Sequence, residues 1–354
     1  MINKNLSAKI LTVCPEYKSP RGGVAQCVSS YSKMIFRDFK TVRNSCSGKA
    51  INKAAKCLAA IFALIGTLMV DQNIKIVHIH TASYNSFRRS SIFVRLSKIM
   101  GRKVVLHIHG GGFKEYYASE PSFVKRILAS CDTIAVLSPF WKSYFDGICG
   151  PAKVKVIPNI IENPLFMDVV DDGMFHLLFL GQIQRAKGIF DLVDVVKAHK
   201  TEYGGKLILD IGGGMFEVEQ LKKTIDDNHL DGMVKFHGWV SGDDKIRLLN
   251  TADAFILPSY TEGVPISILE AESYGLPVLS TRVGGIPEIV GDGENGFLFA
   301  PGDKIAMKAD IDKLLTDRDL RRKMGKSSRG KAAKNLPSHI ESVLTSLYDD
   351  LLTV

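Results

Sequence analysis

Cysteine is scarce in this 354-residue sequence, and its pattern argues against several classes of protein. No two of the six cysteines have the C-x-x-C spacing of a zinc ribbon, and they do not form the dense framework of a small disulfide-stabilised domain. They are Cys14, Cys27, Cys46, Cys57, Cys131 and Cys149. The first apolar run, residues 10–14, is too short for the core of a signal peptide. We therefore expect free thiols and a cytoplasmic protein.

Long hydrophobic runs are also few. The longest, Ala54–Val70, has about 17 residues and contains Lys56, whereas a membrane-spanning helix needs ~20 apolar residues. We expect a buried helix of the first domain here. The alternative is a segment that dips into a membrane surface.

Patterns for metal and dinucleotide binding are missing as well. No D-x-D follows an apolar strand, and Asp310–Asp312 and Asp317–Asp319, which have that spacing, lie in polar sequence typical of surface or capping residues. The glycines in LDIGGGMFEVE (residues 209–219) lack the third glycine of G-x-G-x-x-G, so they indicate a close approach of the backbone instead. We expect no metal ion and no bound cofactor.

Positive charge is concentrated in the first half of the chain. Residues 1–165 hold 24 Lys and Arg against 8 Asp and Glu, a formal charge of +16, whereas the remaining residues hold 22 and 29, a charge of −7. Within the basic half, Ser86–Lys103 interleaves cations with apolar residues and predicts a basic amphipathic helix. An anionic partner is expected, either a phosphorylated substrate or an acidic membrane surface. Nucleic acid is not expected, because no nucleic-acid-binding motif is present.

Short β-branched runs alternate with helical segments in both halves, which predicts parallel α/β sheets. A stretch rich in Pro, Asn and Asp, residues 158–174, predicts the linker between two domains. The expected strands are 9–14, 76–80, 104–109, 133–137 and 155–158 in the first half, and 177–180, 206–211, 234–236, 254–257, 278–280 and 297–299 in the second.

Two glutamates stand near the start of one predicted helix in the second half. The run 252–257 ends at Pro258, which indicates a buried strand opening into a loop. A helix is expected from about Pro265 to Tyr274, since proline suits the first turn and Gly275 the stop. Glu262 then precedes the helix N-terminus, which attracts phosphate, and Glu270 lies inside the helix. This arrangement suits a ligand with a central phosphate group, such as a sugar nucleotide.

The stretch Ser259–Val290, more than thirty contiguous residues, resembles the donor-binding region of the retaining GT-B glycosyltransferases, glycosyltransferase family 4 (glycosyl transferases group 1). The resemblance implies an α/β fold of two Rossmann-like domains facing a cleft. Residues 1–165 would form the acceptor-side domain and residues 166–335 would bind the nucleotide sugar. Residues 336–354 would form a helix that packs back on the first domain.

The resemblance also implies a reaction, the transfer of a sugar with retention from a nucleotide-diphosphate donor to an acceptor hydroxyl. The acceptor would be a carbohydrate or a lipid-linked molecule in bacterial surface polysaccharide or glycolipid assembly. The donor base, uridine or guanosine, stays open. A location at the inner face of the membrane would suit the basic first domain. Two alternatives remain: a non-hydrolysing sugar-nucleotide epimerase of the same fold, and a degenerate paralogue that binds sugar nucleotides without catalysis.

Individual roles follow from the resemblance. Glu262 and His109 would contact the transferred sugar, Lys187 would neutralise the departing diphosphate, and Glu270 would bind the ribose. The main chain near the helix start, together with two further loops, would complete the donor site: Gly22, Gly23, Val240, Gly263, Val264, Pro265 and Ile266.

Two features of these motifs leave questions open. Gln182 occupies the arginine position of the family pattern G-R-x-x-x-x-K-G, and Arg185 is a candidate substitute for the missing charge. His107 and His109 point the same way along a strand, so a metal site is an alternative there, although no third ligand is apparent nearby in the sequence. A second pair, His78 and His80, suits either the acceptor side or a buried structural role.

Overall fold

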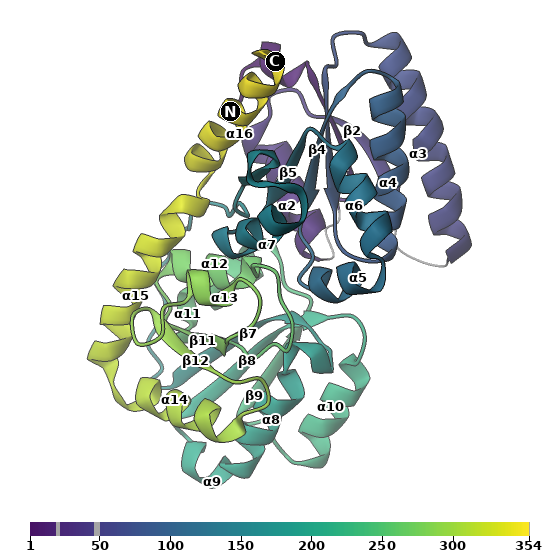
Figure 1. Ribbon diagram of the computed structural model, residues 1–354. Helices are drawn as coiled ribbons and strands as arrows, with labels where there is room; N and C mark the ends of the chain where they lie inside the picture. Colours follow the sequence, from purple (N-terminus) through teal and green to yellow (C-terminus); the bar gives the residue numbers. More distant parts are fainter. Residues whose placement is uncertain (19–21, 46–49, 354) are drawn as a thin grey trace. The chain divides into compact units, whose positions relative to one another are not determined.

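The computed structural model describes residues 1–18, 22–45 and 50–353, without the side chains of residues 50, 51 and 53. The chain separates into two compact units, unit 1 with residues 1–162 and 334–354, and unit 2 with residues 163–333. Each unit contains one parallel six-stranded sheet with helices packed on it (Figure 1). The predicted α/β fold class is confirmed.

Unit 1 orders its strands β2-β1-β3-β4-β5-β6. Five of them lie close to the predicted positions, but β2 was not predicted, because its sequence KTVRNS buries only Val42 and Asn44 and has no continuous apolar run. The strands are β1 (Ile10–Pro15), β2 (Lys40–Ser45), β3 (Ile76–Thr81), β4 (Lys103–Ile108), β5 (Thr133–Val136) and β6 (Val154–Val156).

The helices of unit 1 include the last helix of the chain, α16. Its side chains Ile340, Leu344 and Leu347 are buried, as their helical spacing predicts. The α-helices are α1 (Lys4–Ser7), α2 (Gly23–Ser30), α3 (Ala50–Val70), α4 (Asn85–Ile99), α5 (Phe113–Ser119), α6 (Pro121–Ser130), α7 (Pro139–Cys149) and α16 (Pro337–Thr353). A π-helical turn, η1 (Tyr31–Ile35), follows α2, and a 3₁₀ turn, η2 (Pro151–Lys153), precedes β6.

Helix α3 corrects one expectation. The apolar run was predicted to be a buried helix, and Leu64 and Leu68 are indeed fully buried. The opposite side is exposed, however, with Leu58 at 56% and Phe62 at 67%. A single helix on the outside of a sheet buries one face, and no neighbouring element covers the other face within the part of the chain that the structure describes. Helix α4 forms where the basic amphipathic helix was predicted, but two apolar residues of that stretch, Ile92 and Ile99, are exposed at 40% and 81%.

Unit 2 orders its strands β12-β11-β10-β7-β8-β9. All six were predicted, and residues 159–174 before them contain no regular element, as expected for the linker stretch. Strand β7 extends further than predicted at both ends. The strands are β7 (Phe175–Gln182), β8 (Leu207–Gly214), β9 (Val234–Gly238), β10 (Ala254–Leu257), β11 (Val278–Thr281) and β12 (Gly296–Phe299).

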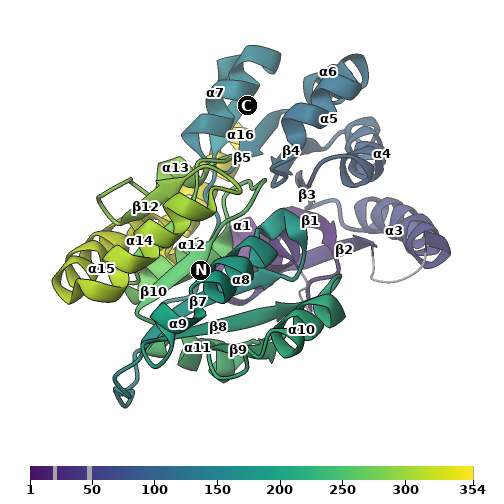
Figure 2. The same cartoon turned by 90° about the horizontal axis from the view of Figure 1, so that it is seen from below.

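The strand order of unit 2 reverses between β7 and β10, its two central strands. Helices α8 and α11 lie on opposite faces of this sheet, as right-handed connections require (Figure 2). Ligands of open α/β sheets bind beyond the carboxyl ends of the strands at such a reversal. The helices are α8 (Ile189–Ala198), α9 (Lys200–Tyr203), α10 (Val218–Asp227), α11 (Gly242–Thr251), α12 (Ile266–Tyr274), α13 (Ile286–Ile289), α14 (Lys304–Thr316) and α15 (Arg318–Ala332), with the 3₁₀ turn η3 (Arg185–Lys187). A further 3₁₀ turn, η4 (Ala333–Asn335), begins at the last residue of unit 2 and continues into unit 1.

Candidate functional site

Three loops meet at the carboxyl ends of β7, β10 and β11. Tyr260 donates its backbone N–H to the carbonyl of Ala186 at 2.9 Å, and Gly285 donates to Gly263 at 2.7 Å. The approach is so close that a Cβ atom on Gly188 would lie 2.0 Å from the carbonyl oxygen of Pro258. Gly188 also has φ +69°, which disfavours other residues. These contacts hold the three loops together at the carboxyl ends of the strands of unit 2, and we call this region the loop edge.

Glu262 and Lys187 form an ion pair at this edge. The Lys187 Nζ lies 2.5 Å from the Glu262 Oε1, and the Ser259 hydroxyl donates to the same oxygen at 2.9 Å. The side chains are 20% and 11% exposed for Lys187 and Glu262, so the pair is partly shielded from water. An ammonium group has three donors, which leaves Lys187 able to bind an anion while it holds Glu262. The structure thus brings together two predicted residues that are 75 positions apart.

Helix α12 begins beside this pair. It runs from Ile266 to Tyr274 after Pro265, and Gly275 ends it with φ +81°, close to the predicted limits. The first N–H groups of a helix have no acceptor within it and carry a partial positive charge. Gly263, Val264, Pro265 and Ile266 are all buried, so this turn is held in place by packing. The edge is suited to bind an anionic group such as a diphosphate.

Glu270, inside α12, has a partner that the sequence did not indicate. Lys245, on α11, places its Nζ 2.7 Å from the Glu270 Oε1. Their side chains are 24% and 14% exposed. Because 25 residues separate the two in sequence, only the packing of α11 against α12 brings them together.

Gln182, at the end of β7, takes part in local contacts. Its Oε1 accepts from the Gln184 Nε2 at 3.0 Å, and its Nε2 lies 3.7 Å from the Met215 Sδ. Arg185, the candidate substitute for the missing charge, is 67% exposed and lies 3.4 Å from a carboxylate oxygen of Glu217. Its guanidinium therefore already has an anionic partner.

The glycine run at the end of β8 is a place of close backbone packing, as expected. A Cβ atom on Gly213 would lie 2.0 Å from the carbonyl oxygen of Gly181, and one on Gly212 would lie 2.6 Å from the Val240 Cγ2. Val240 thus packs directly on the strand end. The next two residues, Met215 and Phe216, have φ values of +70° and +37°, which are unfavourable for side chains of this size.

Family models match both units. The model described as "Glycosyl transferases group 1" matches residues 169–331, and that of "Glycosyltransferase Family 4" matches residues 37–163. The chain belongs to the GT-B glycosyltransferases of family 4. The family inferred from residues 259–290 is thereby confirmed, and retention of configuration stays a prediction.

Individual relatives of this glycosyltransferase are distant. An amylovoran biosynthesis glycosyltransferase of Erwinia amylovora is 29% identical over 61% of this chain, which spans 56% of the length of that protein. The N-acetyl-alpha-D-glucosaminyl L-malate synthase of Bacillus anthracis is 27% identical over 79% of this chain and 76% of the length of the synthase. The structure of Anabaena HepE in complex with UDP-glucose has the same fold, with a TM-score of 0.76 and 19% identity over 96% of this chain and 99% of that one.

The predicted donor-contacting residues of unit 1 lie at the start of α2 and just after the end of β4. Gly22, with φ +124°, precedes α2, which starts at Gly23. His109 follows β4, and its Nε2 lies 2.9 Å from the Nδ1 of His80. Burial of its ring lowers the pKa of His109 to about 4, so the imidazole is neutral near pH 7.

His80 and His109 belong to a row of four histidines, of which two lie on β3, one on the neighbouring β4 and one, His109, directly after β4. The Nδ1 of His78 lies 2.6 Å from the hydroxyl of Tyr348 on α16, and its Nε2 lies 3.3 Å from the Nδ1 of His107. Burial lowers the pKa of His78 to about 3 and that of His107 well below its ordinary value. The row is a network of neutral rings that ties α16 to the sheet of unit 1.

Two overlapping groups in this region have spacing that suits a metal ion. They are Cys27 with His80 and His109, and His78 with His80 and His107, and within each group the ligand atoms lie within 4.8 Å of one another. The 2.9 Å between His80 and His109 is the length of an N–H···N hydrogen bond. Burial also raises the pKa of the Cys27 thiol to about 12. The structure therefore brings in third ligand atoms that were not apparent nearby in the sequence, and hydrogen bonds also join the rings of these groups to one another.

The described cysteines Cys14, Cys27, Cys57, Cys131 and Cys149 are all free, as expected, and Cys46 lies outside the described residues. Of the D-x-D aspartates, Asp317 has the capping role predicted for it, whereas Asp310 is buried, at 8% exposed, and so does not have the predicted surface role. Asp317 accepts from the Leu320 N–H at the start of α15, and Asp310 pairs with Lys313.

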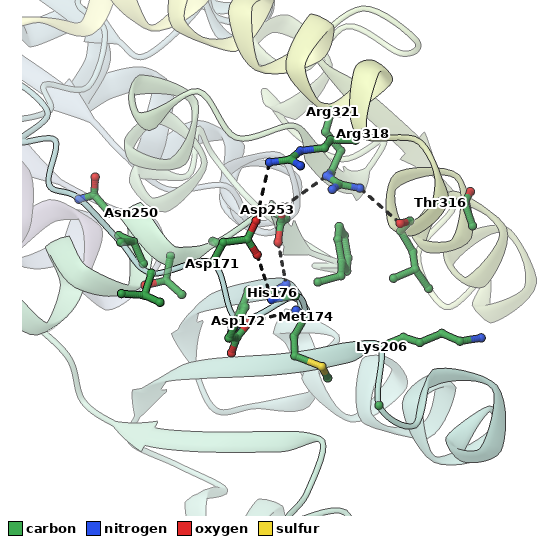
Figure 3. A pocket seen from close by; sticks show the side chains of 18 of the residues that line it. Asp171, Asp172, Met174, His176, Lys206, Asn250, Asp253, Thr316, Arg318 and Arg321 are labelled. Carbon is green, nitrogen blue, oxygen red and sulfur yellow. Dashed lines mark hydrogen bonds and ion pairs between the residues drawn. The ribbon is translucent and has the colours of Figure 1, made fainter.

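A pocket of about 800 Å³ lies at the other edge of the unit 2 sheet, where β7 and β10 begin (Figure 3). Its wall includes Asp171, Asp172, His176, Asp253 and Arg321. The sequence did not predict this pocket. Because it adjoins the amino ends of the strands, it is separate from the loops that hold Glu262.

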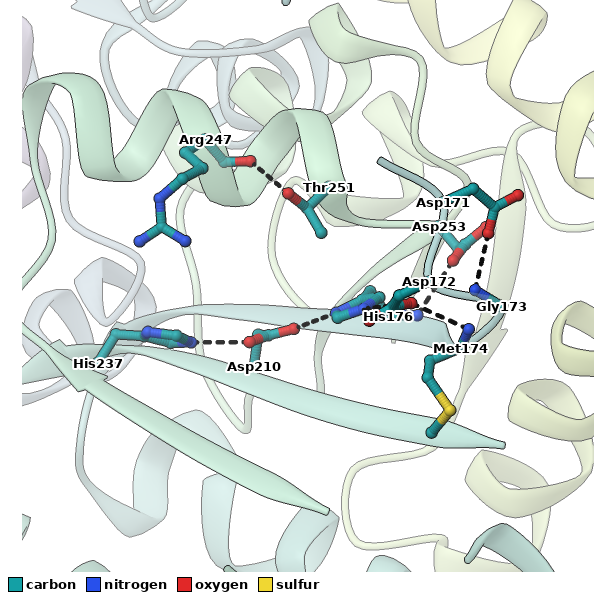
Figure 4. Close-up of polar contacts among 10 residues, drawn as sticks. All are labelled: Asp171, Asp172, Gly173, Met174, His176, Asp210, His237, Arg247, Thr251 and Asp253. Carbon is teal, nitrogen blue, oxygen red and sulfur yellow. Dashed lines mark hydrogen bonds and ion pairs between the residues drawn. The ribbon is translucent and has the colours of Figure 1, made fainter. Parts of the chain in front are cut away.

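A series of polar contacts runs from this pocket across neighbouring strands of the unit 2 sheet (Figure 4). The Nδ1 of His176 donates to the Asp210 Oδ2 at 2.7 Å, and the Nε2 of His237 donates to the Asp210 Oδ1 at 2.7 Å. Chiefly through the bond to Asp210, the pKa of His176 is raised above its ordinary value. These residues join strands β7, β8 and β9.

Proposed function

We propose that the chain is a nucleotide-sugar-dependent glycosyltransferase whose donor binds at the loop edge of unit 2. The observation that carries this proposal is the Lys187–Glu262 pair beside the start of α12, at the reversal of the strand order. The donor diphosphate would bind the α12 N-terminus and Lys187, and Glu262 would contact the transferred sugar. Glu270 would accept hydrogen bonds from the ribose hydroxyls, and Val240 would border the base.

We propose transfer with retention on one face of the sugar. The bond from the anomeric carbon to the phosphate oxygen breaks, the acceptor oxygen bonds to the same face, and the departing phosphate takes the acceptor proton. Glu262 would orient the sugar and stabilise its developing positive charge. A role as nucleophile, in a double displacement, is the alternative, and the contacts of one Glu262 oxygen with Lys187 and Ser259 favour the electrostatic role.

Cations of the chain would stabilise the leaving group, and no metal is required in this proposal. Lys187 and the helix N-terminus supply positive charge where the diphosphate develops negative charge. Gln182 supplies a hydrogen bond without charge, so the stabilisation rests more on Lys187. The roles of His109, Gly22 and Gly23 stay predictions, and His109→Ala tests the first of them.

Two substitutions test the donor site. Glu262→Gln should lower turnover by about 100-fold or more, the usual cost of losing a contact made to transition-state charge. Glu270→Ala should mainly weaken nucleotide binding, by about tenfold or more, because hydrogen bonds to a charged group are lost. Turnover and titration calorimetry measure the two effects. Full turnover and affinity in both variants would contradict the proposal.

Product analysis separates transfer from the alternatives. A transferase releases a nucleoside diphosphate, whereas an epimerase returns a sugar nucleotide and a degenerate paralogue releases nothing. A thermal-shift series with UDP, GDP and their sugars identifies the base. The UDP-glucose in the HepE structure favours testing uridine donors first.

We also propose a role in polysaccharide or glycolipid assembly at an anionic membrane surface. The amylovoran glycosyltransferase relative supports the pathway class. Helix α3 exposes Leu58, Phe62, Met69 and Val70, and the adjacent α4 carries exposed cations that include Arg88 and Arg95 (Figure 1). Among the described residues, no helix is long and apolar enough to cross a bilayer. Exposed apolar side chains next to cations suit binding at the lipid headgroups.

A further inference from the structure

We propose that Lys245 is the positioning residue of the ribose-binding carboxylate, and that it sets the preference for ribonucleotides over 2′-deoxyribonucleotides. This inference rests on the proposed donor site. It concerns a residue on α11 that does not belong to the loops assigned to the donor.

The first step is the geometry of the pair. Lys245 Nζ lies 2.7 Å from the Glu270 Oε1, a distance typical of a charge-assisted hydrogen bond. Glu270 lies on α12, and its carboxylate is only 14% exposed. A partly buried carboxylate is fixed more firmly by such a bond than an exposed one, because fewer water molecules compete for it.

The second step is the chemistry of the carboxylate. An ionised carboxylate has two oxygens with about four acceptor positions. Lys245 occupies one position on Oε1 and so fixes the plane of the group, while Oε2 stays available to accept from sugar hydroxyls. A ribose presents two neighbouring hydroxyls, and a carboxylate held in one orientation can accept from both. A carboxylate that rotates freely accepts from either one.

The third step compares the two glutamates. Glu262 is held by Lys187 and Ser259, which belong to loops at the edge of the sheet. Glu270 is held from a helix, α11, that follows β9. Each carboxylate therefore has its own lysine, and the two lysines come from different elements. Removing Lys245 should weaken nucleotide binding and leave the chemical step intact, so that KM rises and kcat does not fall.

The test uses Lys245→Met and Lys245→Arg in the full chain, with Lys308→Met as the matched control. Lys308 is 23% exposed, close to the 24% of Lys245, and it also forms an ion pair in unit 2, with Asp312. Titration calorimetry measures binding of UDP, GDP, ADP, their 2′-deoxy forms and pyrophosphate. We expect Lys245→Met to lose about tenfold in affinity for the preferred nucleotide, with a smaller ribose preference and unchanged pyrophosphate binding. Lys245→Arg should recover most of the affinity, and Lys308→Met should behave as the wild type.

A double substitution separates positioning from a general charge effect. In a Glu270→Gln background, Lys245→Met should cause little further loss if Lys245 acts through Glu270. Equal losses for nucleotide and pyrophosphate would instead place Lys245 at the diphosphate and overturn the proposal. Wild-type nucleotide affinity in Lys245→Met would overturn it while the proposed function stands. A wild-type chain that binds none of these nucleotides would overturn both.

Discussion

At the residue scale, glycines decide how closely the loops at the carboxyl ends of β7, β10 and β11 can approach one another. Gly284, with φ +55°, would place a Cβ atom 1.9 Å from the carbonyl oxygen of Glu262. The sequence shows Gly188 and the pair Gly284-Gly285, but not which backbone segment each of them meets. Their partners come from segments tens of residues away.

Gly188→Ala should destabilise unit 2 more than Gly205→Ala. Both glycines have φ +69°, which costs a non-glycine residue ~1–2 kcal/mol. A Cβ atom on Gly188 would also collide with Pro258, whereas nothing lies within 4 Å of one on Gly205. We expect Gly188→Ala to lose about 2 kcal/mol more in the free energy of unfolding, measured by urea denaturation. Equal losses of unfolding free energy in the two variants would show that the loops of Gly188 and Pro258 can move apart without a loss of stability.

At the element scale, polar side-chain contacts join three strands of unit 2, β7, β8 and β9, away from the loops that hold Glu262. Burial favours a higher pKa for Asp210, but the hydrogen bonds from His176 and His237 outweigh it and lower the pKa below its ordinary value. The pKa of His176 is raised in turn. No local pattern in the sequence indicated this cluster, because His176, Asp210 and His237 lie on three different strands.

The His176 contact makes stability depend on pH. The pKa of His176 is higher in the folded protein than in the unfolded chain. The contribution of this histidine to the free energy of unfolding is therefore complete below the unfolded pKa of ~6.5, and it is lost as the pH rises through the folded pKa. We expect His176→Gln to lower Tm more at pH 6 than at pH 9, measured by thermal unfolding. His339→Gln, on α16, serves as the control. A Tm difference that stays constant between these pH values would contradict the assignment.

The strands and helices themselves were largely predictable. Strand β10 and the helix that follows it lie at or within one residue of the predicted limits, because an apolar run, two prolines and a stop glycine mark them locally. Strand β2 was missed because its pairing with β1, and not its own composition, makes it a strand. The domain limits at residues 165 and 335 stay predictions.

At the scale of the whole molecule, the exposed face of α3 is the surface through which we propose that the protein binds an anionic membrane. We expect Phe62→Ser, combined with Leu58→Ser, to reduce co-flotation with vesicles of phosphatidylglycerol and phosphatidylcholine several-fold. Each of these side chains contributes at most about 1.5–3 kcal/mol to the free energy of membrane binding, the value for full burial in the lipid. Flotation should also fall with added salt, since cations contribute.

The control for this experiment is Ile305→Ser, at an exposed apolar residue of unit 2 that is 85% accessible. It should leave flotation unchanged. Binding that is equal for phosphatidylcholine alone, or that survives the double substitution, would contradict the proposed membrane surface.

Local signals in the chain, namely apolar periodicity, caps and the motif between residues 259 and 290, were enough to predict the α/β fold class, the order of most elements and the family. They also singled out Glu262, Glu270 and Lys187 as candidate donor-site residues. The contacts of Lys187 with Glu262 and of Lys245 with Glu270 became visible only in the folded chain. Folding also leaves one face of α3 exposed. Such pairings depend on how helices and loops pack in space, and no short-range pattern encodes the packing of residues 25 or 75 positions apart.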